Sequence, residues 1–242
     1  MAIFLPDANW IDITGQITDN AWSVVTVSPP AGATGALVAF IKPDGLTSDQ
    51  KAGTRGVGWT EDGFEYSRLV ASQRAAKYSY APLTGDQFEA IATVTNGMLV
   101  YVAGWLEPED AGFASGFSDL GTLVDDTWTT IDCSALVPAG ATAAIFRSNL
   151  LSTARRLSLR VQEGDEEISG IHSLSAWDYV VPLTATKTFD IKVDVAGQFS
   201  FSLFGWCLDR YITIASIEGD GSVGESTFSS AGVWEYFIVA PL

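Results

Sequence analysis

The chain has 242 residues and a mass of 25.8 kDa, and its 13 Lys and Arg against 29 Asp and Glu give a formal net charge of 13 − 29 = −16. A charge this negative argues against binding nucleic-acid phosphates and against docking on an anionic membrane. Hydrophobic residues make up 47% of the chain, which indicates a globular fold. No apolar run approaches the roughly 18 residues of a membrane helix, and the first residues have no basic start of a secretory signal.

The chain offers little material for His-based catalysis or for a metal cage. It has one histidine, His172, and two cysteines, Cys133 and Cys207. A Ser-His-Asp relay would have to pass through His172, and no nucleophile motif lies near it. Both cysteines lie in strand-like apolar stretches, where a buried thiol behaves as a small hydrophobe. We therefore expect no enzyme activity, no cofactor and two free thiols.

Strand-like stretches follow one another along the whole chain. They alternate at period two or are fully apolar, they are rich in β-branched and aromatic residues, and Gly, Pro, Asn and Asp separate them. In chain order the clearest stretches are 34–42, 90–105, 156–162, 189–195 and 198–206. Asn96-Gly97 and Ala196-Gly197 predict tight two-residue hairpins. Seven or eight strands in about 100 residues predict an all-β fold of jelly-roll-like β-sandwiches.

A set of sequence landmarks occurs twice in the same order. GQITDNAW at 15–22 matches GTLVDDTW at 121–128, and both copies then carry a PAGAT turn, an Arg, a Pro and a closing Gly-Trp. The matched pairs are Trp22 and Trp128, Pro30 and Pro138, Arg55 and Arg160, Pro82 and Pro182, Gly104 and Gly205, and Trp105 and Trp206. The offset drifts only from 138 − 30 = 108 to 182 − 82 = 100, as short changes in loop length would produce. The sequence thus predicts two homologous sandwiches.

The repeat divides the chain into three parts. Residues 1–108 form the first predicted sandwich and 109–209 the second, with a short linker at its start. The stretch EPEDAGFASGFSD at 107–119 suggests this linker, because it is rich in Gly, Ser and acidic residues. Residues 210–242 form a strand-rich extension of 242 − 210 + 1 = 33 residues, too short for a core of its own.

The extension contains two apolar strands that need partners. The strands at 211–217 and 233–240 could fold back on this chain's own sandwiches or pair across subunits. The acidic, Gly- and Ser-rich middle would let the second strand extend to a neighbouring subunit, which favours pairing across subunits. Trp234, Tyr236 and Phe237 would then serve as anchors.

Aromatic and charged residues give the candidate contact sites. Trp22, Trp105, Trp128 and Trp206 recur in both copies, which is typical of buried anchors, with a sugar-stacking platform as the alternative. Trp59, Trp177 and Trp234 have no Trp counterpart, so we expect them on exposed contact surface.

For the repeated turn and the repeated arginines, we favour a structural interpretation. In the PAGAT turn, Pro fixes φ, and Gly32 or Gly140 supplies a left-handed residue. Arg55 and Arg160 are expected to reach a carboxylate across the sheet, with a ligand contact as the alternative. Acidic turns at 61–62, 125–126, 163–167 and 218–225 are candidates for Ca²⁺, but solvated turns explain them as well and no metal-ligand set is predicted.

The order of the landmarks resembles a module of structural proteins in tailed-phage particles. That module has a Trp, a PAG-T-G turn, a strand with Arg before an acidic turn, and a closing Gly-Trp or Gly-Tyr. The matching residues are Trp22, Pro30, Gly32, Gly35, Arg55, Asp62, Gly104 and Trp105 in the first copy, and Trp128, Pro138, Gly140, Arg160, Gly205 and Trp206 in the second. The acidic turn departs from the family's GSTDD, reading GWTEDG at 58–63 and QEGDEE at 162–167.

The resemblance covers about 200 residues and implies a non-enzymatic virion component: a capsid decoration or cement protein, a head fibre or spike, or a tail part. Such a protein would assemble in the host cytoplasm, as a homo-oligomer or on major capsid or tail proteins, without nucleic acid or membrane. The alternative is a tandem carbohydrate-binding module that uses exposed Trp, with or without calcium. Glycan binding could also be a second role of a virion protein.

Overall fold

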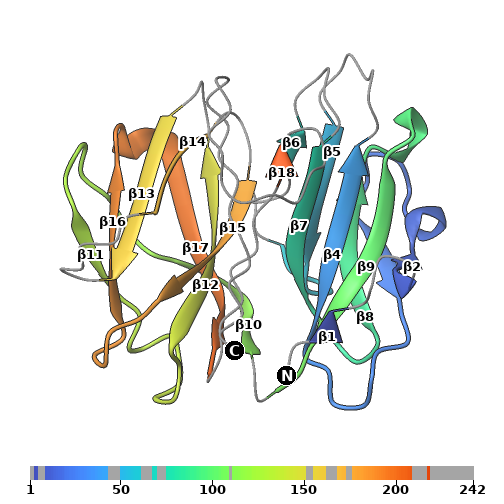
Figure 1. Cartoon of the computed structure of the whole chain (residues 1–242), viewed down its shortest axis with the longest axis horizontal. Coiled ribbons are helices and arrows are strands. Elements are labelled where there is room, and N and C mark those ends of the chain that lie inside the picture. The colour runs from blue at the N-terminus through green and yellow to red at the C-terminus, as the bar shows by residue number, and fades with distance from the viewer. Residues whose placement is uncertain are drawn as a thin grey trace.

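The computed structural model describes residues 3–4, 9–42, 50–60, 67–69, 75–108, 111–150, 155–161, 168–172, 176–208 and 217–218. These residues form two β-sandwiches that lie side by side (Figure 1). Apart from short 3-10 turns they contain only strands and loops, and no helix among them is long and apolar enough to cross a membrane.

The first sandwich has two antiparallel sheets. One sheet consists, in spatial order, of β1 (Ile3–Phe4), β9 (Leu99–Leu106), β4 (Gly35–Lys42) and β7 (Ala75–Pro82), with β2 (Ile11–Asp12) also pairing with β9. The facing sheet consists of β3 (Ser23–Thr26), β8 (Gln87–Ala92), β5 (Gln50–Arg55) and β6 (Ser67–Leu69).

The second sandwich repeats this arrangement. Its first sheet consists of β10 (Ala111–Asp119), β17 (Phe199–Cys207), β12 (Ala143–Leu150) and β15 (Ala176–Pro182). Its second sheet consists of β11 (Thr129–Asp132), β16 (Thr188–Val193), β13 (Arg155–Val161) and β14 (Ile168–His172).

Both sandwiches have jelly-roll wiring. When β1 and β2 are counted as one interrupted strand, the strand order in each sandwich is first-eighth-third-sixth in one sheet and second-seventh-fourth-fifth in the other. The register agrees as well, because β4 and β12 each shift register against the closing strand, at Leu37/Val38 and at Ile145/Phe146. The predicted fold class is confirmed.

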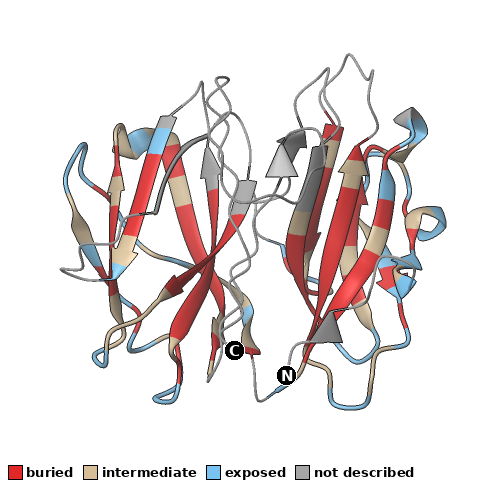
Figure 2. Cartoon of the chain, in the orientation of Figure 1, coloured by how far each residue is buried: buried red, intermediate tan, exposed pale blue. Residues whose placement is uncertain are grey.

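The interior of each sandwich holds its own apolar core. Val38 and Phe40 of β4 point into the first core, and Ala144 and Phe146 of β12 point into the second. Figure 2 shows buried residues running along the central strands of both sandwiches. These strands are apolar over most of their length because their outward faces are also covered, in the second sandwich at the junction and in the first by residues such as Trp10 and Tyr78.

The linker predicted at the start of the second sandwich is wrong. Residues 111–119 form β10, which pairs with the closing strand β17 through Ala111 and Cys207. At Gly112 the lack of a side chain is a packing requirement, because a Cβ there would lie 2.6 Å from the ring of Trp206. Composition alone does not reveal such a neighbour.

The predicted two-residue hairpins are also wrong. Short 3-10 turns stand in their place, η3 (Val94–Asn96) and η4 (Ala196–Gln198). A third 3-10 turn, η2 (Thr14–Gln16), lies earlier in the chain. Carboxylates from distant loops hold the first two turns: Asp19 accepts a hydrogen bond from the Thr95 amide at 3.0 Å, and Asp125 accepts one from the Ala196 amide at 2.7 Å. The repeated DNAW and DDTW motifs therefore fasten one end of each sandwich.

The described part of the C-terminal extension pairs within its own chain. β18 (Ile217–Glu218) pairs with Ala76 and Ala75 of β7, at the edge of the first sheet. Ile217 is the last residue of the strand predicted at 211–217, and its partner is thus intramolecular. Residues 233–240, with Trp234, Tyr236 and Phe237, lie outside the described residues.

Candidate functional site: the junction between the two sandwiches

The repeated tryptophans and arginines stack in pairs, each pair in its own sandwich. The Arg55 guanidinium lies 4.1 Å from the ring centroid of Trp22, and Arg160 lies 4.1 Å from that of Trp128. Each arginine also forms the expected ion pair across the sheet, Arg55 Nε to Glu89 at 2.5 Å and Arg160 Nε to Asp190 at 3.1 Å. In both pairs the two residues are direct neighbours on adjacent strands.

The PAGAT turns make the same strand connection in both copies, although only the first contains a glycine with a left-handed φ. Gly32 has a φ of +90°, whereas Gly140 does not lie in the left-handed region. Thr34 and Thr142 follow the turns, and their amides donate to the carbonyl oxygens of Leu106 and Cys207 at the ends of the closing strands. The turn thus fixes the start of β4 or β12 to the last strand of its sandwich.

Trp59 does not lie on exposed contact surface as predicted. It is 9% exposed and belongs to an apolar cluster between the sandwiches, whose buried members are Trp59, Tyr80, Leu106, Ala111, Ala143, Ile145, Val180, Phe204 and Cys207. Its ring meets that of Phe117 edge-on at 5.0 Å. A Trp without a counterpart is found here because only the first sandwich presents this side to the other repeat.

Register-equivalent positions from both repeats meet in this cluster. Tyr80 and Val180 occupy the same place on β7 and β15, and Leu106 and Cys207 end the two closing strands. The rest of the contact is not symmetric, because Ile145 and Phe204 lie in this cluster whereas their counterparts Leu37 and Ala103 lie in a separate one. The junction therefore joins different sides of the two sandwiches.

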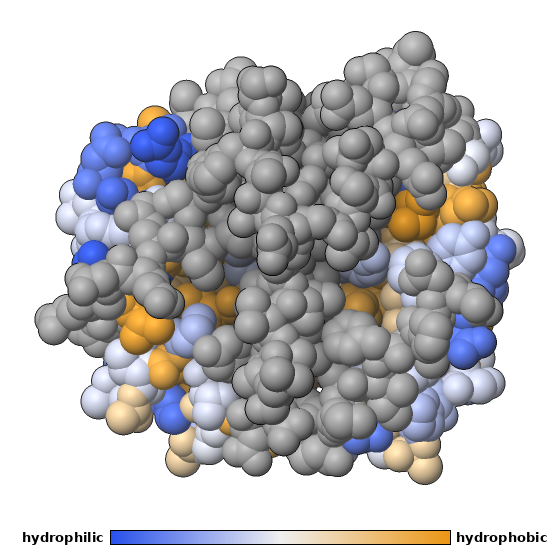
Figure 3. Space-filling view, viewed as in Figure 1, coloured by the Kyte–Doolittle hydropathy of each residue, from blue (hydrophilic) through white to orange (hydrophobic). Residues whose placement is uncertain are grey.

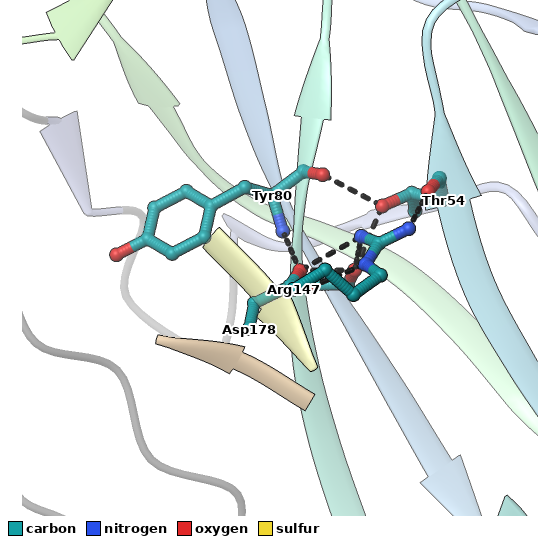
Figure 4. A network of polar contacts seen from close by, with 5 residues as sticks. Thr54, Tyr80, Arg147 and Asp178 are labelled. Atoms are coloured by element: carbon teal, nitrogen blue, oxygen red, sulfur yellow. Dashed lines mark hydrogen bonds and ion pairs between the residues drawn. The ribbon is translucent and has the colours of Figure 1, made fainter. Parts of the chain in front are cut away.

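A buried ion pair crosses the apolar cluster (Figure 4). Arg147 on β12 donates from Nε to Asp178 Oδ1 at 2.5 Å and from Nη2 to Asp178 Oδ2 at 2.9 Å, and the two side chains are 1% and 2% exposed. Asp178 is its neighbour on β15. This fork-to-fork geometry is the strongest form of a carboxylate–guanidinium pair.

The same pair binds the first sandwich. Arg147 Nη1 donates to the carbonyl oxygen of Thr54 at 2.6 Å, and Nη2 donates to Ser79 Oγ at 3.0 Å. Ser79 Oγ in turn donates to Asp178 Oδ2 at 2.8 Å. A buried charge pair is tolerated only when hydrogen bonds satisfy its remaining donors and acceptors, and here the other repeat supplies them.

The network also closes the edge of β7. The backbone amide of Tyr80 donates to Asp178 Oδ2 at 3.1 Å, and its carbonyl oxygen accepts a hydrogen bond from Thr54 Oγ1 at 2.8 Å. Side chains thus satisfy an edge that could otherwise pair with another strand. Burial raises the pKa of the Tyr80 phenol well above its ordinary value, and Cys207 and Asp178 add to this effect.

Aromatic rings enclose the charge. The Arg147 guanidinium lies 5.3 Å from the ring centroid of Phe117 and 5.1 Å from that of Phe204. Phe117 reaches this place because β10 breaks its pairing with β17 between Phe113 and Ser118. The irregular strand thus places an aromatic wedge between Trp59 and Phe204.

A groove of about 590 Å³ lies beside the junction, and both repeats line it. Its walls are the first PAGAT turn, the turn before Trp59, the loop after β7 and the start of β10. The lining residues are Ala33, Thr34, Val57, Gly58, Trp59, Pro82, Leu83, Thr84, Gly85, Phe113, Ala114 and Ser115. None of these side chains carries a charge, on a chain whose net charge is −16.

Two predicted site residues are placed only by their positions in strands. Trp177 falls in β15 opposite Ser148, and His172 ends β14 opposite Arg155. The acidic stretches at 61–62 and 163–167, and nearly all of 218–225, lie outside the described residues. Of the calcium candidates, Asp125-Asp126 and Glu218 lie in the described part of the chain, and Asp125 holds η4 with its carboxylate.

The two cysteines are free and buried, as predicted. Burial raises the pKa of the Cys133 thiol to about 12, and the nearby Asp132 adds to the shift. Cys207 lies in the junction cluster.

Sequence reasoning missed Arg147 and Asp178, although one signal was present. Arg147 is the only charged residue in the apolar stretch AAIFRSNL, and the register-equivalent residue of the first repeat is Ala39. A charge that appears in one copy of a buried strand indicates a contact that only this copy makes. In the view of Figure 3, hydrophilic residues lie on both outer flanks of the molecule, next to hydrophobic ones.

Comparison with known proteins gives no family for this chain. No family of known proteins matches the sequence, and no curated protein matches it either. Among solved structures, one similar chain comes from a study of a structural element that modulates proton-coupled electron transfer in oxalate decarboxylase. The match covers 88% of this chain and 78% of that one, at 8% identity and a TM-score of 0.22. Agreement this low does not establish a shared fold or activity.

Proposed function

We propose that this chain is a non-enzymatic structural component of a bacteriophage particle that works through protein–protein contacts on a capsid or tail. The observation that carries the structural role is the junction, where Arg147 and Asp178 bind Thr54, Ser79 and Tyr80 of the other sandwich. A bridging or decorating protein needs a fixed distance between its ends. A buried, hydrogen-bonded charge pair favours one relative position, because any other position leaves the charges unsatisfied.

The phage context of the proposal comes from the sequence resemblance. The landmarks that carry it have structural tasks in this molecule: the PAGAT turns join strands, Trp22 and Trp128 stack on arginines, and the acidic residues before them hold turns. The resemblance therefore concerns how the module is built, and it leaves head and tail positions equally open.

Mass spectrometry of purified particles tests the proposal. The chain should be present at a stoichiometry set by the particle's symmetry, and particles from a strain without it should lack the density it contributes. Its absence from washed particles would disprove the role.

Glycan binding is the second candidate, and the groove beside Trp59 is the feature that favours it. Its volume falls within the range of small-ligand sites, and an aromatic ring and hydroxyl side chains line it. Trp59 itself is 9% exposed, which leaves little ring face for stacking on a sugar. A glycan array with the wild-type chain and a Trp59→Phe variant tests this candidate.

A further inference from the structure

The two repeats differ at one place beside the groove. In the second repeat, Lys187 Nζ donates a hydrogen bond of 2.6 Å to the carbonyl oxygen of Ala141, in the PAGAT turn. The ammonium group thus covers an outward carbonyl of that turn. Lys187 has a φ of +64° and is half-buried, so the backbone presents it for this contact.

The matching place in the first repeat has no such hydrogen bond among the described residues. Ala33 is the counterpart of Ala141, since their amides donate to Pro30 and Pro138 in the same way. Ala33 lines the groove, and no described residue donates a hydrogen bond to its carbonyl oxygen. A turn carbonyl that accepts a lysine hydrogen bond in one repeat thus has no donor among the described residues in the other.

The residue that stands in place of the lysine has the opposite charge. Asp86 is the counterpart of Lys187, because their carbonyl oxygens accept hydrogen bonds from Val27 and Cys133, which are themselves register-equivalent. Asp86 is exposed and follows Gly85, which lines the groove. An acid next to a groove residue, together with uncharged walls and a turn carbonyl to which no described residue donates, suits an ammonium ion that comes from outside the chain.

We propose that the groove beside Ala33 accepts a lysine side chain from a partner protein, whose ammonium group takes the place that Lys187 takes in the second repeat. The inference rests on the proposed role in a particle. It also specifies the partner, which would present a protruding lysine on a basic surface. The charge of −16 would steer such a surface toward this chain, and the groove would select the lysine.

The test uses the full chain and a short peptide, acetyl-Gly-Lys-Gly-amide, followed by NMR of the backbone amides. We expect saturable shifts at Ala33, Thr34 and Gly85, and we expect none with the same peptide acetylated at Nζ. Asp86→Lys gives the first repeat the second repeat's residue and should weaken binding at least about tenfold, because a charge-assisted hydrogen bond is lost and a like charge is added. Asp86 is exposed, so this variant should remain folded.

The reverse substitution gives a matched gain of function. Lys187→Asp uncovers Ala141 and should create a second set of shifts, at Ala141 and Thr142. Asp also tolerates the left-handed backbone at this position. Shifts spread evenly over the acidic surface, or unchanged by Asp86→Lys, would overturn the inference.

The particle test keeps this inference separate from the proposed function. If the chain is present in particles but the peptide does not bind the groove, the inference alone fails. If the peptide binds but the chain is absent from particles, the proposed function fails and the groove remains a lysine site.

Discussion

Replacing Arg147 by Met should weaken the junction more than any other single change of similar size. The substitution keeps most of the side-chain volume but leaves the Asp178 carboxylate, 2% exposed, without its cation. Breaking a buried pair in this way costs about 3–5 kcal/mol. For a chain of this length, that loss lowers Tm by roughly 6–20 °C.

The double variant Arg147→Met/Asp178→Leu should recover part of this stability. Removing both charges eliminates the unpaired carboxylate, so the remaining cost is the Tyr80 amide, the Ser79 hydroxyl and the Thr54 carbonyl oxygen, which lose their partners. An unsatisfied buried group costs about 1–3 kcal/mol. The double variant should therefore be more stable than Arg147→Met alone.

The assay is chemical unfolding of the wild type, of the single variants Arg147→Met and Asp178→Leu, and of the double variant. Arg156→Met is the matched control. Arg156 is exposed on β13, and its loss should change the free energy of unfolding by less than about 0.5 kcal/mol. The single variant should also separate the unfolding of the two sandwiches into two transitions. Equal stability of Arg147→Met and wild type, or additive losses in the double variant, would refute the reasoning.

Three further predictions follow from the packing. Cys133 and Cys207 should resist Ellman's reagent at pH 8 and react fully in denaturant. Thiolate is the reactive form, and burial raises the pKa of Cys133 to about 12, so fast reaction of the native protein would contradict this. Gly205→Ala should cost roughly 1–3 kcal/mol in a thermal melt, since its Cβ would lie 2.8 Å from the Gly112 carbonyl oxygen, whereas Gly116→Ala meets nothing within 4 Å and should be neutral. Arg55→Met and Arg160→Met should each cost about 1–2 kcal/mol in the same melt, because each removes an ion pair and a ring contact; no loss in either variant would contradict this.

Much of the architecture can be predicted from the sequence because the signals are local and occur twice. Alternation in 189–195 places Phe189, Ile191 and Val193 in the core. The landmark order predicts two sandwiches, and the matched arginines predict the ion pairs with Glu89 and Asp190. Each of these features depends on neighbours along one strand or on the adjacent strand, so the pattern of residues carries it.

The tertiary structure alone decides where the two repeats meet. Composition suggests a linker at 107–119, but these residues include the strand β10, in which Gly112 makes room for the ring of Trp206. Trp59 is buried by Phe117, and Arg147 is satisfied by Thr54 and Ser79, residues 93 and 68 positions away. A sequence shows that a charge or an aromatic ring is present, but its energy depends on what surrounds it, and here the other sandwich provides those surroundings.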